Sequence, residues 1–360
     1  MNFFKKFTSN TYAGSSNQLF FCMADGESRK GRAFYKISTG GKYNYSFLFS
    51  NIIDSTYSDG SISHKNLICD SWVILEGRVG KSTAFQFNES VCPEVTWLSG
   101  LTFHHSKIKE VMPGEFFSSD PVELSFEKGE YLCIELFFAG KMIPYHEETL
   151  LPMFLEEDNE WRYSKKMPLP AMIGCDRRVK KRVAFLGDSI TQGIGTEINS
   201  YAHWNAVLSE KLGEEYAFWN LGIGYGRAND AASDGAWLYK AKQNDIVFVC
   251  FGVNDILQGM SPEQIKDDLM HIVDVLSSLG IQIVLQTVPP FDYEGKDIEK
   301  WQKINEYINA VLSKKVLMVF DNVQILAVSD EKSYMAKFGG HPNAEGCKVW
   351  ADALYASLDL

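Results

Sequence analysis

The sequence predicts an α/β fold in which a doubly wound parallel sheet is preceded by an antiparallel β-sandwich. Short strands separated by turn residues fill the first half of the chain, whereas apolar strands alternate with helical stretches in the second half. The length of 360 residues also exceeds the size at which a single core keeps growing. We therefore expect a sandwich over residues 1–165, a connection over 166–180 and a parallel-sheet domain over 181–360.

Several apolar stretches of the first half alternate with polar residues, and Gly, Pro, Asp, Asn and Ser cluster between them. This punctuation is typical of an antiparallel sandwich. The expected strands are residues 45–51, 71–78, 84–90, 94–103, 121–126 and 131–138.

Continuous apolar stretches of the second half are typical of buried parallel strands. They are residues 182–187, 217–222, 245–252, 281–288 and 316–321, and helices are expected over 201–212, 229–242, 262–279, 298–314 and 344–358. Strand–helix alternation predicts right-handed crossovers, with ligands bound beyond the carboxyl ends of the strands.

Composition limits the classes of partner. The net charge of −11 offers no basic excess for nucleic acid or anionic membranes, and no apolar run is long enough to insert into a membrane. Seven scattered cysteines without a CxxC pair predict neither a disulfide framework nor a zinc site, and the start of the chain lacks a signal-peptide pattern. We expect a cytoplasmic enzyme without metal or organic cofactor. The sequence does not indicate an oligomeric state.

Two of four chemically suggestive stretches contain a possible nucleophile and a glycine-rich turn. Ser189 follows a strand end, where its hydroxyl and N–H can meet a substrate, although Asp188 and Ser189 could simply cap a helix. Residues 222–226, read GIGYG, let the backbone approach a ligand. A dinucleotide site is a weaker alternative, because the spacing is GxGxG instead of GxGxxG, and a plain turn is another.

The other two stretches contain an amide and an imidazole. Asn254, in GVND, can donate to a developing oxyanion, or can form an Asn–Asp turn with Asp255. His341, in GGHPN before the last helix, can act as a general base, or can be an ordinary surface histidine. All four stretches follow strand ends of one α/β layer, which favours one shared site over four unrelated turns.

The blocks GDSIT, NLGIGYG, GVND and GHPNAEG resemble, in order and spacing, the four signature blocks of the SGNH (GDSL-type) esterase family, over about residues 181–357. The resemblance implies a flavodoxin-like layering of the sheet, with Ser189 as nucleophile and His341 as base. It also implies an oxyanion hole made by the N–H of Ser189, a second-block N–H and the side chain of Asn254. Asp188 and Asp255 are expected to support the loops.

Two positions depart from the family pattern. Tyr225 stands where the second-block glycine is usual, so the donor N–H could belong to Tyr225 or to Gly224. Phe338 stands where an aspartate normally precedes the histidine by three residues. Asp321, Asp330 or Glu331 could replace that carboxylate, but none has the expected spacing. The favoured interpretation is a Ser189–His341 dyad.

The N-terminal half resembles, more weakly, the sandwich of two-domain bacterial carbohydrate acetylesterases, through residues 49–51 and 119–140. This resemblance implies hydrolysis of short acyl esters, above all acetyl, on a small molecule or oligosaccharide. A lysophospholipase or thioesterase acting on longer chains, and a catalytically silent carbohydrate-binding protein, are the alternatives. Three aromatic residues could form a sugar platform, but strand spacing favours a core position for Trp72, Trp97 and Phe103. Adjacent strand positions make metal binding by His104 and His105 together improbable.

Overall fold

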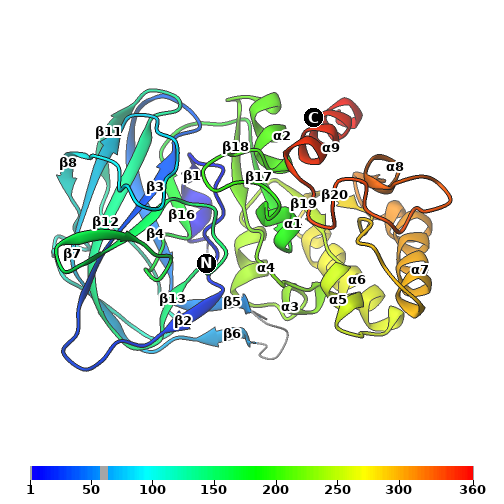
Figure 1. The fold of residues 1–360 in the computed structure, drawn as a ribbon, viewed down its shortest axis with the longest axis horizontal. Helices are drawn as coiled ribbons and strands as arrows, with labels where there is room; N and C mark the ends of the chain where they lie inside the picture. Colours follow the sequence, from blue (N-terminus) through cyan, green and yellow to red (C-terminus); the bar gives the residue numbers. More distant parts are fainter. Residues whose placement is uncertain (1, 57–63, 360) are drawn as a thin grey trace.

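The computed structural model describes residues 2–56 and 64–359. Its N-terminal part is an antiparallel β-sandwich and its C-terminal part a parallel sheet covered by helices, and the two lie side by side (Figure 1). The predicted fold class is confirmed.

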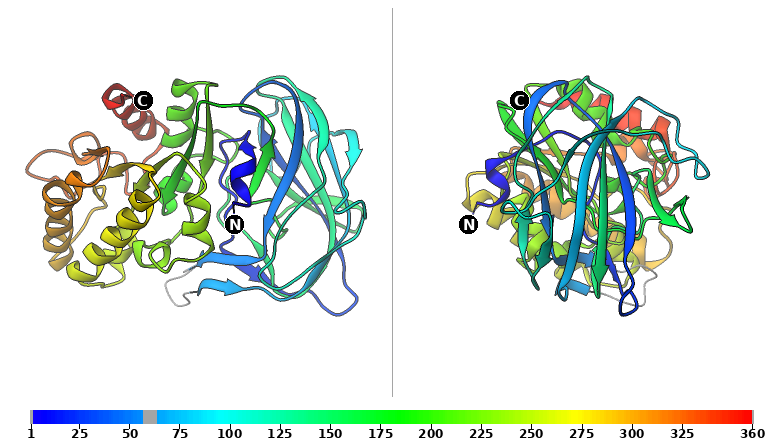
Figure 2. Two further views of the ribbon diagram at one scale, coloured as in Figure 1. Left: turned by 180° about the vertical axis from the view of Figure 1, so that it is seen from behind. Right: turned by 90° about the vertical axis from the view of Figure 1, so that its left-hand side faces the viewer.

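Two antiparallel sheets form the body of the sandwich. One has the order β1-β16-β4-β10 with β11 also on β4, and the other has the order β15-β14-β3-β12-β7-β8 with β9 also on β7. Two further antiparallel pairs, β13-β2 and β5-β6, accompany these sheets, and β5-β6 extends toward the C-terminal part (Figure 2). The strands are β1 Thr8–Ser9, β2 Leu19–Phe21, β3 Arg29–Lys36, β4 Gly41–Ser50, β5 Ile52–Thr56, β6 His64–Ile68, β7 Trp72–Ser82, β8 Thr96–Gly100, β9 Lys109–Val111, β10 Phe116–Ser118, β11 Val122–Phe126, β12 Tyr131–Gly140, β13 Ile143–Tyr145, β14 Met153–Glu157, β15 Glu160–Tyr163 and β16 Met172–Cys175.

The strands β3, β14 and β15 were not expected from the sequence, and two further stretches also differ from its predictions. Residues 84–90 form no strand, because Phe85 and Phe87 turn inward and pack against rings on the face of the larger sheet. Residues 166–180, expected to be a connection, contain β16, which pairs with both β1 and β4. The chain therefore returns to the sandwich before it enters the second sheet.

The parallel sheet has the strand order β18-β17-β19-β20-β21, the flavodoxin-like arrangement. Helices α2 and α9 pack together on one face, where Trp204 stacks on Trp350 at 4.8 Å, and α6 and α7 lie on the other (Figure 1). The strands are β17 Lys181–Gly187, β18 Tyr216–Asn220, β19 Ile246–Cys250, β20 Gln282–Gln286 and β21 Met318–Phe320. The helices are α1 Ser189–Gln192, α2 Trp204–Leu212, α3 Ala228–Ala231, α4 Ala236–Ala241, α5 Val253–Leu257, α6 Pro262–Ser278, α7 Lys296–Ala310, α8 Val323–Leu326 and α9 Ala344–Ser357, with short 3-10 turns at Phe4–Lys6 (η1) and Leu312–Lys314 (η2).

The helix expected over 229–242 is divided into α3 and α4. Asp234 between them has a positive φ of 58°, and Gly235 is the residue before α4. A left-handed residue cannot continue a right-handed helix. The interruption gives α3 its own orientation beneath the glycine-rich turn.

The two parts of the chain share a core. Phe4 packs against Trp219 of β18 at 5.0 Å, and the Trp219 indole N–H donates to the Ala171 carbonyl at 2.8 Å. Asp54 of β5 forms a 2.5 Å ion pair with Lys240 of α4, and both side chains are fully buried. The interface between the two parts is therefore buried and packed like a protein core. Within the described ranges, no helix is sufficiently long and apolar to traverse a bilayer.

Candidate active site

Ser189 is the first residue of α1, immediately after β17. The carboxylate of Asp188 accepts a hydrogen bond from the Ile190 N–H at 3.0 Å and caps this helix. The Ser189 hydroxyl is directed elsewhere: its Oγ lies 2.7 Å from Nε2 of His341, although 152 residues separate the two. Capping and nucleophile positioning are thus divided between two adjacent residues.

His341 lies in the loop before α9, whose start is fixed by the Asn343 side chain accepting from the Gly346 N–H at 3.0 Å. The edge of the Phe291 ring contacts the imidazole, at 5.3 Å between centroids. Burial lowers the pKa of His341, since desolvation disfavours the charged ring. The neutral imidazole needed by a general base is therefore the favoured form near neutral pH.

Within residues 2–56 and 64–359, no carboxylate oxygen lies within 4 Å of a ring nitrogen of His341. Asp321 instead accepts from the Thr287 hydroxyl at 3.0 Å, and Asp330 and Glu331 are exposed. Phe338 packs against α9, where a Cβ at Gly346 would come within 2.6 Å of the Phe338 Cβ. The place of the usual aspartate is occupied by an apolar contact.

The second glycine-rich block passes very close to α1. A Cβ at position 222 would lie 2.2 Å from the backbone nitrogen of Gln192, so only glycine fits there. The Gln192 side chain then accepts from the Gly224 N–H at 2.7 Å and donates to the Glu148 carbonyl. This glutamine, which the sequence interpretation missed, joins the nucleophile helix to the second block.

Most N–H groups of the second block bond to the protein itself. Gly222 donates to the Asn220 side chain, Ile223 to the Gly187 carbonyl and Gly226 to the Ile223 carbonyl, in addition to the Gly224 bond. Tyr225 adopts a positive φ of 59°, which turns its peptide relative to its neighbours. The N–H of Gly224, one residue earlier, is directed at the Gln192 side chain.

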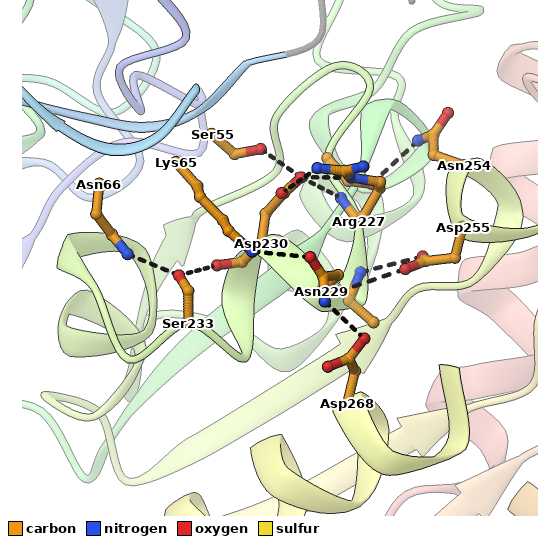
Figure 3. A network of polar contacts seen from close by, with 12 residues as sticks. Ser55, Lys65, Asn66, Arg227, Asn229, Asp230, Ser233, Asn254, Asp255 and Asp268 are labelled. Atoms are coloured by element: carbon orange, nitrogen blue, oxygen red, sulfur yellow. Dashed lines mark hydrogen bonds and ion pairs between the residues drawn. The ribbon is translucent and has the colours of Figure 1, made fainter. Parts of the chain in front are cut away.

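Asn254 lies in the first turn of α5, directly beyond β19, and is half-buried. Its side-chain amide donates to the Gly226 carbonyl at 3.0 Å, which brings the third block against the second. The next residue, Asp255, accepts from the N–H groups of Ala228 and Asn229 at 3.0 and 3.4 Å. Figure 3 shows these contacts beside each other.

Two carboxylates behind the site are completely buried. Burial raises the pKa of Asp188 to about 7 and also that of Asp255 to about 7, because each is desolvated. Both carboxylates accept backbone N–H bonds, which oppose the shift. Their contacts are with loop backbone, in line with the supporting role expected of them.

A buried polar network behind α1 was also missed. The Asn220 amide donates to the Gln192 carbonyl at 3.2 Å, and Asn205 donates to the Thr191 carbonyl. His203 contacts Asn205 at 2.8 Å, and burial lowers the pKa of His203 to about 4. A polar residue at the end of an apolar strand, as at Asn220, is the signal in the sequence that could have revealed it.

The sandwich also reaches the site. The Gln18 amide donates to the Gly224 carbonyl at 3.3 Å and to the Glu148 carboxylate at 2.9 Å. Burial raises the pKa of Glu148. These contacts join residues 206 and 130 positions apart, so no local pattern in the sequence could predict them.

A groove of about 590 Å³ lies between the two parts of the chain, lined by residues 85–87 and 197–200. The second of these segments begins next to the catalytic loop: a Cβ at Gly195 would be 2.7 Å from the His341 carbonyl oxygen. Residues 197–200 follow Gly195 by two to five positions, which span at most about 7–18 Å of extended chain, and neither Ser189 nor His341 lines the groove itself. In the described part of the chain, no group of three or more His, Cys, Asp or Glu side chains is arranged to hold a metal.

Residues 185–349 match the GDSL-like Lipase/Acylhydrolase family. The chain therefore contains a GDSL-type (SGNH) acylhydrolase domain, as the four sequence blocks predicted, and this domain is an ester hydrolase by family.

Individual proteins of known name match about half of the chain. The chain is 27% identical over 179 residues to Thioesterase 1/protease 1/lysophospholipase L1 of Escherichia coli (strain K12), covering 48% of this chain and 81% of that protein. Among solved structures, a member of the lipolytic protein G-D-S-L family from Veillonella parvula DSM 2008 is 19% identical, with a TM-score of 0.39, and covers 49% of this chain and 97% of its own. The acetyl xylan esterase AlAXEase is 18% identical, with a TM-score of 0.41, covering 49% and 100%.

Proposed function

We propose that the protein is a serine esterase that removes short acyl groups, acetyl above all, from carbohydrates through a Ser189–His341 dyad. The observation that carries the proposal is the 2.7 Å contact between the Ser189 hydroxyl and the His341 imidazole at the carboxyl edge of the sheet. A hydroxyl within hydrogen-bond reach of a neutral imidazole is the arrangement of an activated nucleophile.

In the acylation half-reaction, the Ser189 oxygen attacks the acyl carbon as His341 Nε2 takes the hydroxyl proton. The tetrahedral intermediate collapses, the bond to the leaving oxygen breaks, and His341 returns the proton to the departing alcohol. Water then attacks the acyl-serine, giving its proton to His341. Collapse of the second intermediate releases the carboxylic acid and restores the Ser189 hydroxyl.

The oxyanion hole is assigned to three donors: the N–H of Ser189, a second-block N–H and the Asn254 amide. The second donor is the N–H of Tyr225 or of Gly224, and the Gly224 N–H also bonds to the Gln192 side chain. An amide bonded to the Gly226 carbonyl through one hydrogen keeps its second hydrogen for the substrate. Removing one such donor costs about 10²–10³ in kcat in other hydrolases.

Support for a carbohydrate comes from the groove beside the catalytic loop. Phe85 and Phe87 are half-buried there, opposite the polar residues Glu197, Asn199 and Ser200. Sugars present apolar C–H faces to aromatic rings and hydroxyls to polar groups, so a mixed lining suits them. Trp72 and Phe103 are buried in the sandwich core and Trp97 lies beneath the guanidinium of Arg78, so these rings do not form the platform.

Action on longer acyl chains is the second candidate, favoured by the similarity to the Escherichia coli thioesterase and lysophospholipase. A catalytically silent sugar-binding protein is disfavoured, because a hydroxyl–imidazole contact of 2.7 Å serves no binding role.

The test has two arms. Initial rates with 4-nitrophenyl acetate and 4-nitrophenyl octanoate rank chain length, and we expect acetate to be preferred; a preference for octanoate favours the second candidate. A panel of acetylated mono- and oligosaccharides, assayed for released acetate, tests the acceptor, with the Ser189→Ala variant as control. Rapid aryl acetate turnover without acetate release from any sugar would contradict the carbohydrate assignment.

A further inference from the structure

The second block lies between the two parts of the chain and is held from the sandwich side at Gly224. Gln18, just before β2, donates to the Gly224 carbonyl at 3.3 Å, and its own side-chain oxygen accepts from the Glu148 N–H at 3.2 Å. The Glu148 carboxylate lies so near that a Cβ at position 224 would be 1.3 Å from it. The sandwich thus contacts the block at the Gly224 carbonyl, while Gln192 accepts from the Gly224 N–H.

The same segment is held again a few residues later. Ser55 of β5 donates to the Asp230 carboxylate at 2.8 Å, and both side chains are fully buried. Asp230 in turn pairs with Arg227 at 2.6 Å. Asn66 of β6 contacts Ser233 at 2.6 Å and accepts from the Ala236 N–H at 3.1 Å. Figure 3 shows the β5–β6 pair lying over α3 through these contacts.

From this segment the contacts continue to the third block. The Gly226 carbonyl accepts from the Asn254 amide, and the N–H groups of Ala228 and Asn229 bond to Asp255. Residues 224–230 therefore connect the sandwich on one side to the assigned oxyanion donor on the other (Figure 3). Within residues 2–56 and 64–359, the bond to the Gly226 carbonyl is the hydrogen bond that orients the Asn254 amide.

We propose that the N-terminal sandwich is a working part of the oxyanion hole, in which Ser55 and Gln18 are positioning residues. They fix residues 224–230 and, through the Gly226 carbonyl, the Asn254 amide. The proposal rests on the esterase function given above. Donors aimed in advance at the developing charge need no rearrangement during reaction, and a displacement of about 1 Å can cost about 10² in rate.

The main test is the Ser55→Ala variant, assayed with 4-nitrophenyl acetate. Loss of the bond to Asp230 loosens α3, so kcat should fall about tenfold while KM stays within about twofold. Ser55→Thr keeps the hydroxyl and should restore most of kcat. Gln18→Met keeps the side-chain length without the amide. Its kcat should likewise fall while its KM stays nearly unchanged.

A double-mutant cycle shows whether Ser55 acts through the oxyanion donor. If it does, Ser55→Ala should have little further effect in an Asn254→Ala background, because the group that it positions is gone. Full additivity of the two losses would overturn the route through Asn254.

Lys128→Met is the matched control for breaking an interdomain contact. Lys128 pairs with Glu210 at 2.8 Å, and Glu210 lies near the end of α2, which leads into the amino end of β18, whereas the site lies at the carboxyl ends of the strands. Its kcat should equal that of the wild type. Thermal unfolding of every variant separates loss of stability from loss of positioning.

The outcomes separate the two proposals. An active wild-type enzyme with an unchanged kcat in both Ser55→Ala and Gln18→Met overturns the positioning role alone. A wild-type protein inactive on every ester overturns the proposed function. Positioning is then read from the rate at which a fluorophosphonate modifies Ser189, since that reaction also develops charge on an oxygen in the hole; an unchanged rate in Ser55→Ala overturns it.

Discussion

Burial, and not a neighbouring carboxylate, sets the pKa of His341 beside Ser189. The ring of Phe291 contacts the imidazole, and desolvation alone lowers the pKa of His341. A triad aspartate would stabilise the imidazolium and act in the opposite direction. In the proposed dyad, the base therefore stays neutral at lower pH but is charged at greater cost during the reaction.

The pH dependence of kcat/KM follows from this difference. The active form is the neutral imidazole, so the rate falls as pH drops through the pKa of His341, and we expect a midpoint below 6.5 for an aryl acetate. Enzyme incubated at each pH and then assayed at pH about 7 controls for unfolding. A midpoint at or above about 7 would indicate an acidic partner for the ring and contradict the dyad.

The approach of Ser189 to His341 could be predicted from the sequence, because the serine and asparagine follow strand ends, the histidine precedes the last helix, and each lies in a short, recognisable block. Gln192, Glu148 and Gln18 could not, since their partners lie far away along the chain. The bond from the Gly224 N–H to Gln192 likewise involves a side chain outside the block.

At the scale of elements, strand ends bring the site together. β17, β18 and β19 are neighbours in the parallel sheet, so the segments that follow them meet at one edge. The sequence predicted these strands because they are continuous apolar runs. It failed where tertiary contacts decided the outcome, as at Phe85 and Phe87, whose alternation looks like a strand but whose rings fill a gap on the sheet face.

The segments that follow β20 and β21 indicate whether an acidic residue takes part in catalysis. Asp321, directly after β21, accepts a hydrogen bond from Thr287, directly after β20, and Asp330 is exposed. We expect Asp321→Asn and Asp330→Asn each to leave kcat within a few-fold of the wild type. A loss near 10⁴ in either variant, the size seen when a triad aspartate is neutralised, would return a carboxylate to the mechanism.

For the whole molecule, the two parts are united by a common interior. The fully buried ion pair of Asp54 and Lys240 joins β5 to α4, and Asp54 also accepts from the Asn17 N–H at 2.9 Å. A charge left in such a place without its partner is strongly unfavourable. We infer that the sandwich and the acylhydrolase domain unfold together.

This pair gives a stability prediction. Lys240→Met strands the Asp54 carboxylate and should lower the free energy of unfolding by about 3–5 kcal/mol, measured by urea denaturation. The double variant Asp54→Asn/Lys240→Met leaves no charge at this position, so its free energy of unfolding should fall by less than that of Lys240→Met. Two separate unfolding transitions in the wild type, or a double variant weaker than the single, would contradict a shared core.

The chemistry is tested most directly by trapping the acyl-enzyme. Protein quenched with acid during turnover of 4-nitrophenyl acetate is digested and its peptides are analysed by mass spectrometry. We predict an acetyl group on Ser189, absent from Ser189→Ala, which should also lose turnover. An acetyl group on a different residue, or undiminished turnover in Ser189→Ala, would contradict the assignment of Ser189 and His341 as the catalytic pair.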